Sequence, residues 1–497
     1  MSIHPLAHGV SPVALSKHAK QPLRVMTPFS LATPAFPALD RRIAPYSKWL
    51  LPYRALRLLW VVLLIPIHVL LCILVGLGCP LESVVPTGLY PVTHKYSWTL
   101  LQSIFYPILK RLIWSITDVG GAPRFSDDEA RTIPRWTVWL LRVVYPGSEY
   151  VVVHVEDAEP SNEGALGLNV ELVDASTSIY YRGEAYDPSG VILPSSVPLF
   201  WFEQPRQEQK SHIAGRRAGP RERVVLYFVG GGYSYGSPIE GNRCYTIAQR
   251  TGLRVVGANY RKAVRPETAF PAALQDAITA YKHLLDLGFR DIVLAGDSAG
   301  GGLAITLLLY FCKTLVRSPS HPASFILPTG MFLYSPWVDL TLRNHRKLHT
   351  RLADDILSQG QISNAATSYL VNTVEKGKSE DPNSVYNLGA RHPFVSPALP
   401  SSLPTLEYIG KAYAHRPELR ILIFSGQSNG LSSGAECLTP EIHALVWLLR
   451  KVKHGIKLTV VEEKNEVHCY PLMPLWLSPA AERALQMVEA FLLDKAW

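Results

Sequence analysis

Short apolar runs alternate with stretches of helical periodicity through the C-terminal half of the chain. The apolar runs lie at 224–229, 253–258, 292–295, 330–333, 421–424 and 457–461. The helical stretches lie at 271–285, 299–315, 440–452 and 479–493. Fully apolar short strands joined by helices are typical of a parallel sheet that helices cover on both faces. The pattern therefore predicts the α/β class, with a mostly parallel, doubly wound sheet over residues 222–497.

Two regions depart from this alternation. The interval between Asp339 and Pro417 breaks the rhythm of strands and helices, and it predicts a cap region at about 340–417. Upstream of the sheet, β-like runs at 150–154, 178–181 and 198–202 are separated by Pro, Gly and Asn. Such runs predict antiparallel lead-in strands. Residues 79–221 thus form a lead-in and interfacial segment ahead of the main domain.

One apolar stretch near the N-terminus is long enough to cross a bilayer. Residues 58–77 are apolar except for His68, with Pro66 as a possible kink. Twenty such residues match a hydrocarbon thickness of about 30 Å, so we expect a transmembrane helix at 56–78. A cleaved signal peptide is the rival interpretation, disfavoured because the run is long and starts late. The later apolar stretch at 98–117 fits a helix in the membrane interface or a buried helix equally well.

The charge distribution orients this helix. Of the net charge of +9, the first 57 residues carry +7, so the basicity belongs to a loose tail (1–55) rather than to a nucleic-acid-binding face. Apolar residues make up 47% of the chain and charged residues 18%, in keeping with a membrane-associated part. The positive-inside rule places the tail in the cytosol and the large domain in a lumen, which we expect to be that of the endoplasmic reticulum.

The candidate chemistry is centred on Ser298. The sequence Gly-Asp-Ser-Ala-Gly-Gly at 296–301 lies between a predicted strand and a predicted helix. A G-x-S-x-G motif in that context is typical of a nucleophile elbow, a strained turn whose small neighbours let the serine oxygen project above the sheet. The following helix start supplies backbone N–H groups and a positive dipole end. Ser298 is therefore the predicted nucleophile.

Three glycines follow the first strand of the predicted sheet. Residues 230–232 can turn their backbone N–H groups toward a bound carbonyl oxygen, since glycine tolerates unusual backbone angles. With the N–H of Ala299, the N–H groups of Gly231 and Gly232 are the predicted oxyanion hole, each donor contributing about 3 kcal/mol in comparable sites. The six cysteines are scattered without a CxxC pair, so neither a zinc site nor a disulfide scaffold is indicated, and we expect no metal and no cofactor.

These motifs resemble the hormone-sensitive-lipase branch of the α/β-hydrolases, which has an HGGG loop and a GDSAGG elbow. Further matches lie at 259–261, 270–276 and 335–340, and the resemblance covers roughly 222–495. With the predicted anchor, the chain is most similar to fungal membrane-bound steryl acetyl hydrolases, which implies an α/β-hydrolase fold and esterase activity. One departure is Val229, where the family has the histidine that helps to fix the loop.

The other triad members follow from the chain order of this fold, Ser…Asp/Glu…His. His468 comes after the last predicted strand and before the final helix, and it is the predicted base. The acid position falls near Asn429, where an amide replaces the usual carboxylate. An amide orients the imidazole but does not stabilise the imidazolium, and the same change in a serine protease lowers turnover about 10⁴-fold. A displaced carboxylate is the alternative, from a set of three residues: Glu436, Glu463 and Glu466.

Three functions remain open at this level. The first is a membrane-anchored serine carboxylic-ester hydrolase acting on a lipophilic ester of sterol or terpenoid type, acetylated esters included, with Ser298 as nucleophile and His468 as base. The second is a degenerate hydrolase that binds a small molecule, suggested by Asn429 and Val229. The third is an acyltransferase or cyclase in a biosynthetic pathway, in which a water-excluding cap favours an alcohol as acceptor. The expected partners are the substrate and a membrane, and no nucleic acid.

Overall fold

A computed structural model gives the fold of the chain. It describes residues 51–77, 98–117, 152–158, 187, 192–204, 216–238, 243–263, 266–317, 326–342, 355–357, 359–373, 389–427 and 436–494. The predicted strand at 178–181, the N-terminal tail and Asn429 lie outside these residues.

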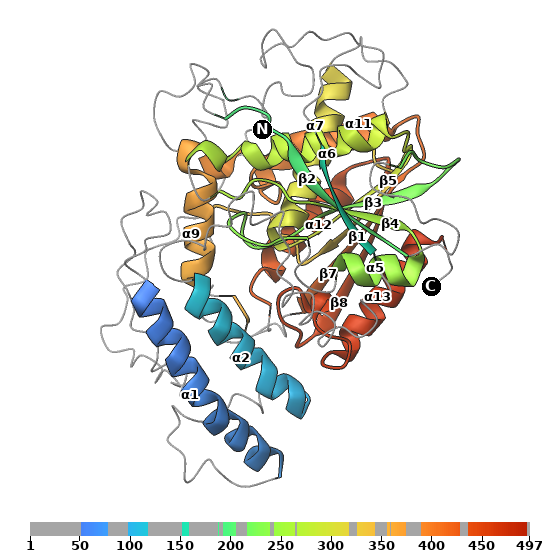
Figure 1. The fold of residues 1–497 in the computed structure, drawn as a ribbon. Helices are drawn as coiled ribbons and strands as arrows, with labels where there is room; N and C mark the ends of the chain where they lie inside the picture. Colours follow the sequence, from blue (N-terminus) through green and yellow to red (C-terminus); the bar gives the residue numbers. More distant parts are fainter. Residues whose placement is uncertain are drawn as a thin grey trace, which may run out of the picture.

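A single sheet of eight strands, in the order β1-β2-β4-β3-β5-β6-β7-β8, forms the centre of the main domain (Figure 1). The strands are β1 Val152–Ala158, β2 Val197–Glu203, β3 Arg223–Phe228, β4 Arg254–Ala258, β5 Asp291–Asp297, β6 Gly330–Tyr334, β7 Leu419–Gln427 and β8 Ile456–Lys464. Strands β3 to β8 pair in parallel, whereas β1 and β2 pair antiparallel. The predicted parallel sheet and its antiparallel lead-in strands at 150–154 and 198–202 are confirmed.

Helices cover both faces of this sheet, as the predicted α/β class requires. The α-helices of the main domain are α5 Arg243–Thr251, α6 Ala272–Asp286, α7 Ser298–Arg317, α9 Gln359–Tyr369, α11 Leu403–Tyr413, α12 Thr439–Lys451 and α13 Pro479–Leu492. Short 3-10 turns are η6 Pro266–Thr268, η7 Val371–Thr373, η8 Gly389–Arg391, η9 Pro400–Ser402 and η10 Tyr470–Leu472. The larger apolar core lies between the sheet and α6, α7, α11 and α12, and a second core lies under α5 and α13.

The predicted cap region divides into two parts of different character. Helix α11 packs against α7 and belongs to the layer that covers the sheet. Helix α9 and the preceding residues 355–357 instead contribute side chains to the pocket above Ser298. The part of the region that acts as a wall of the site is therefore α9 with 355–357, called the cap segment below.

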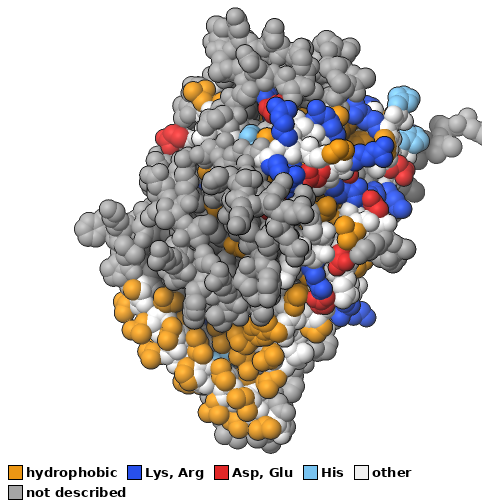
Figure 2. Space-filling view, turned by 45° about the vertical axis from the view of Figure 1, so that its right-hand side comes forward, with side chains coloured by type: hydrophobic (Ala, Val, Ile, Leu, Met, Phe, Trp, Pro, Cys, Tyr) orange, Lys and Arg blue, Asp and Glu red, His pale blue; other side chains and the backbone are white. Residues whose placement is uncertain are grey.

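Two helices precede the sheet and lie side by side (Figure 1). They are α1 Leu51–Gly76 and α2 Leu100–Thr117. His68 and Cys72 of α1 are buried, and His68 Nε2 lies 3.3 Å from the carbonyl oxygen of Ser103 on α2. Most other apolar side chains of α1 are exposed, and Figure 2 shows hydrophobic side chains gathered over this end of the molecule. Helix α1 thus spans most of the predicted transmembrane segment and begins five residues earlier than expected.

One described helix meets the length and hydropathy expected of a membrane span, and it is not α1. That helix is Ser298–Arg317, which is α7 of the hydrophobic core, with 78% of the window buried. A shorter apolar helical stretch within α1 runs over Leu58–Leu74. Burial shows that the hydropathy of α7 reflects its place between helices and sheet.

Helix α2 is buried along one side against the main domain. Tyr106 is 2% exposed and packs with Ile356 and Val467, whereas Leu101 and Phe105 remain exposed. One side of the helix at 98–117 is therefore buried in the protein, and another presents apolar side chains outward; its place in a membrane interface stays a prediction.

Candidate active site

The elbow at Ser298 follows from the glycines around it. Strand β5 ends at Asp297, and helix α7 begins at Ser298, whose φ of 51° lies in the left-handed region. A Cβ atom at Gly300 would lie 2.0 Å from the carbonyl oxygen of Phe228, and one at Gly296 would lie 2.5 Å from backbone atoms of Gly300. Only glycine fits these two positions, so the motif spacing is a packing requirement of the strained turn.

The predicted oxyanion residues lie beside this turn. Gly231 has φ 110° and Gly232 has φ 60°, and both line the pocket that contains Ser298. Ala299 is the second residue of α7, where the backbone N–H has no partner within the helix. Gly231 and Gly232 thus lie at the pocket beside Ser298, and Ala299 directly follows Ser298 in the chain; the role of the three N–H groups as an oxyanion hole stays a prediction.

Two side chains hold the glycine loop in the absence of the family's histidine. The hydroxyl of Tyr260 donates to the carbonyl oxygen of Val229 at 2.6 Å. Asp297 Oδ1 accepts the N–H of Gly230 at 3.0 Å and the hydroxyl of Tyr227 at 2.8 Å. Because both anchors are buried, the substitution at Val229 leaves the loop fixed from two sides.

The cap helix α9 supports the same loop from above. The ring of Tyr233 stacks on that of Tyr369 with centroids 3.8 Å apart and an interplanar angle of 10°. A Cβ atom at Gly232 would lie 2.8 Å from the Cβ of Ala365. Gln361 Nε2 donates to the hydroxyl of Tyr235, which links the middle of α9 to the end of the loop.

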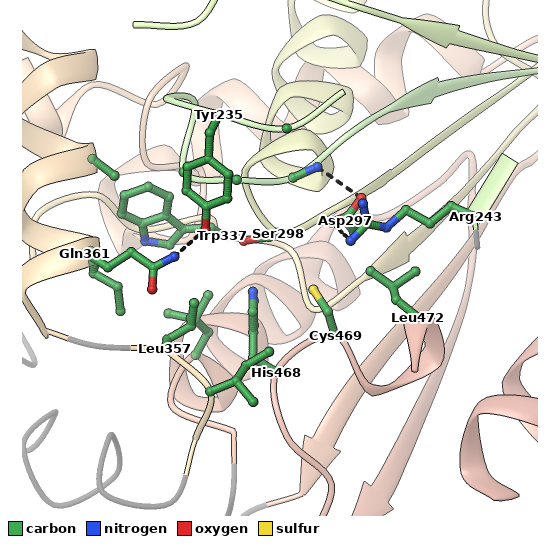
Figure 3. A pocket seen from close by; sticks show the side chains of 18 residues that line it. Tyr235, Arg243, Asp297, Ser298, Trp337, Leu357, Gln361, His468, Cys469 and Leu472 are labelled. Carbon is green, nitrogen blue, oxygen red and sulfur yellow. Dashed lines mark hydrogen bonds and ion pairs between the residues drawn. The ribbon is translucent and has the colours of Figure 1, made fainter. Parts of the chain in front are cut away.

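His468 and Glu436 form the acid–base pair of the site. His468 Nδ1 lies 3.0 Å from Glu436 Oε1, and both side chains are almost wholly buried. The N–H of Gly426 at the end of β7 donates to Glu436 Oε2, which fixes the second carboxylate oxygen. In Figure 3 the ring of His468 stands below Ser298 and points up toward it. The carboxylate lies on the Nδ1 side, leaving Nε2 for the pocket.

Of the three alternative carboxylates, only Glu436 lies at the ring. Glu466 accepts hydrogen bonds from Tyr106 and Gln102 on α2, and Glu463 pairs with Arg483. The predicted acid position at Asn429 lies outside the described residues. Glu436 lies seven residues after Asn429 and reaches the end of β7 through the N–H of Gly426, and the sequence offered no signal that ranked it above the other two.

Burial and the neighbours of His468 act in opposite directions on its ionisation. Burial disfavours the imidazolium, but the contacts with Cys469 and Glu436 outweigh it and raise the pKa of His468 above 6.5. Burial also raises the pKa of the Cys469 thiol, so this group is neutral at pH 7 and Glu436 is the partner that stabilises the imidazolium. Burial raises the pKa of Glu436, while the imidazole and the N–H of Gly426 favour its charged form.

The pocket above Ser298 has a volume of about 290 Å³ and largely apolar walls. Trp337 and Leu357 lie on one side, and Leu472 lies on the opposite side near Arg243, which pairs with Asp297 at 3.3 Å (Figure 3). Ile362 also lines the pocket. A cavity with apolar walls and few polar groups suits a small or elongated lipophilic substrate. Within the described part of the chain, no group of three or more His, Cys, Asp or Glu side chains is placed to hold a metal ion.

The sheet order, the elbow and the following helix define the α/β-hydrolase fold, which the sequence predicted. Residues 225–402 match the family described as alpha/beta hydrolase fold. This match and the fold agree, and the resemblance of the chain to the hormone-sensitive-lipase branch is confirmed.

Three relatives illustrate the breadth of the similarity. An acetyl-hydrolase of Streptomyces hygroscopicus is 33% identical over 35% of this chain and 51% of its own length. A candidate steryl acetyl hydrolase of Schizosaccharomyces pombe is 33% identical over 17% of this chain and 21% of its own. Human hormone-sensitive lipase is 35% identical over 22% of this chain and 11% of its own. The chain therefore spans about half or less of the relatives that it matches.

Proposed function

We propose that the protein is a serine carboxylic-ester hydrolase in which Ser298, His468 and Glu436 form the triad. The observation that carries this proposal is the hydrogen bond between Glu436 and His468 Nδ1, on the ring edge away from the pocket. His468 accepts the proton of Ser298 as the serine oxygen attacks the ester carbonyl, and Glu436 stabilises the resulting imidazolium. The N–H groups of Gly231, Gly232 and Ala299 bind the oxygen of the tetrahedral intermediate.

The proposed substrate is a lipophilic ester, with acetylated sterols or terpenoids as leading candidates. Support comes from the apolar pocket walls and from relatives named as acetyl-hydrolases. The exposed apolar side chains of α1 support an anchor at 58–77 that keeps the enzyme where such esters dissolve. From the basic tail we further propose that the catalytic domain faces the lumen of the endoplasmic reticulum.

The direct test uses a fluorophosphonate probe on the full-length protein in detergent. We expect labelling of Ser298 and hydrolysis of acetyl esters by the wild type, with both lost in Ser298→Ala. The expected loss of turnover is at least about 10³-fold, since the rest of the site retains only residual catalysis. Ser402→Ala is a suitable control because Ser402 is also fully buried, but its hydroxyl donates to the carbonyl oxygen of Ser396 and it does not line the pocket. An unlabelled wild type with no esterase activity would contradict the proposal.

A further inference from the structure

A fully buried aspartate in the cap segment contacts the backbone of both loops that carry the acid–base pair. Asp355 is 0% exposed. Its Oδ1 accepts the backbone N–H of His468 at 2.8 Å, and its Oδ2 accepts the backbone N–H of Cys437, also at 2.8 Å. Oδ1 also lies 2.7 Å from the N of Ile356. The carboxylate of Asp355 thus links the backbone of His468 to the backbone of Cys437, the residue that follows Glu436.

These two contacts join two segments that follow neighbouring strands of the sheet. Glu436 lies between β7 and α12, whereas His468 follows β8. Their side chains meet through a single hydrogen bond of 3.0 Å, whose geometry depends on where the two backbones lie. Because each oxygen of Asp355 holds one of these backbones, the carboxylate fixes their separation. Hydrogen bonds from N–H groups to a charged acceptor are among the stronger ones in a buried site.

Asp355 itself does not touch the reacting atoms. The pocket wall is formed by its neighbours Ile356 and Leu357, and Asp355 is not among the residues that line the cavity. Its effect on chemistry must therefore pass through the positions of His468 and Glu436. A displacement of about 1 Å in a catalytic group is enough to lower turnover about 10²-fold.

We propose that Asp355 is a positioning residue that sets the contact between Glu436 and His468 from the cap segment. The inference rests on the proposed function, since it concerns the same triad. In this proposal the cap segment both lines the substrate pocket and orients the base.

The test compares Asp355→Asn with a matched control, Asp276→Asn, in the full-length protein. Asp276 is 1% exposed and accepts the backbone N–H of Arg261 at 2.6 Å, but it lies away from the pocket. Both changes replace a buried carboxylate by an amide of the same shape and turn an N–H acceptor into a donor. For each variant, kcat, KM, the rate of fluorophosphonate labelling of Ser298 and the melting temperature are measured.

We expect Asp355→Asn to lower kcat and the labelling rate about 10–100-fold with KM changed less than about threefold. Asp276→Asn is expected to lower only the melting temperature. In a Glu436→Gln background, the further loss of kcat from Asp355→Asn is expected to be smaller, because both changes act through the contact between residue 436 and His468. A merely structural role would give equal losses of melting temperature in both variants with kcat of the folded protein unchanged.

If Asp355→Asn yields no folded protein, Asp355→Ser serves in its place, since its hydroxyl oxygen can still accept an N–H and its O–H can rotate away from the two backbone N–H groups. Turnover is then expressed per labelled active site. An unchanged kcat in either folded variant overturns the positioning role while the proposed function stands. Absence of labelling in the wild type would instead overturn the proposed function.

Discussion

At the scale of single residues, the acid beside His468 is the least expected feature of the site. A carboxylate in the turn directly after β7 would be visible from sequence order, but Glu436 lies nine residues after the end of β7, in the segment just before α12. Its approach is fixed by the N–H of Gly426, where an added Cβ would lie 2.2 Å from the carbonyl oxygen of Glu466. The glycine thus leaves room for the chain crossing that brings the displaced carboxylate to the ring.

Exchanging the acid tests its role directly. Glu436→Gln keeps the shape but removes the charge that stabilises the imidazolium, so we expect kcat to fall about 10³–10⁴-fold. Asn429→Asp is the matched comparison, because it places a carboxylate at the position that sequence order favoured. We expect that variant to show wild-type turnover of an acetyl ester. A large gain in Asn429→Asp would mean that Glu436 does not serve His468.

The pH dependence of the reaction follows from the same pair. His468 must be neutral to accept the proton of Ser298, and its pKa is raised above 6.5. We therefore expect kcat/KM to rise with pH along a limb centred above 6.5, and this limb to move to lower pH in Glu436→Gln. The measurement is the pH profile of both enzymes with one soluble ester. Coincident limbs would show that Glu436 does not stabilise the imidazolium.

At the scale of elements, hydropathy located the strands well but did not settle the role of α2. The apolar runs from 224–229 to 421–424 are strands whose residues are almost all buried, whereas the edge strand β8 at 457–461 is only partly buried. The apolar pattern reports this burial. The stretch at 98–117 has no such internal signature. Its partners, Glu466 and Asn465, lie more than 350 residues away, and pairing over that separation is invisible in a local pattern.

The contacts of α2 carry a prediction of their own. Tyr106 donates to Glu466 Oε2 at 2.8 Å, two residues before His468, and burial raises the pKa of Glu466. Tyr106→Phe removes a donor that favours the ionised carboxylate and is expected to cost about 1–3 kcal/mol of stability. The loss should grow as pH rises from about 5 to about 8, because the ionised form is the one that loses its partner.

Thermal unfolding in detergent at several pH values is the measurement for this change. Tyr413→Phe is the control, since its hydroxyl donates at 2.7 Å to the neutral carbonyl oxygen of Pro328. Its cost should be independent of pH. Equal pH dependence in both variants would show that the hydroxyl of Tyr106 does not act through Glu466.

At the scale of the whole molecule, an apolar helical pair adjoins a domain whose active-site loops it contacts. Exposed apolar side chains occur on both helices of the contacting pair α1 and α2, and the ring of Phe105 on α2 lies 5.2 Å from that of the exposed Trp476. Large exposed apolar surfaces mark membrane or protein contacts. We therefore propose that α1 and α2 meet the membrane together.

Removal of α1 separates anchoring from chemistry. We expect the full-length protein to resist extraction from membranes by carbonate and its domain to be protected from protease added outside sealed microsomes. A chain lacking residues 1–77 should be released, keep its kcat on a soluble ester and lose most of its activity on a lipophilic ester held in vesicles. A chain lacking only residues 1–45 keeps Lys48, Arg54 and Arg57 ahead of the apolar stretch and should stay anchored with an unchanged kcat. Extraction of the full-length protein by carbonate would contradict the anchor.

Helix α9 has a bearing on attempts to redesign the pocket. Its inner side both lines the cavity and supports the loop that carries Gly231 and Gly232, through Tyr369, Ala365 and Gln361. Substitutions in α9 therefore change substrate preference and reaction rate together. Variants selected from a directed-evolution library on α9 for a new substrate are expected to lose reaction rate. Leu472 lies across the cavity on a separate turn, so selectivity is best altered from that side.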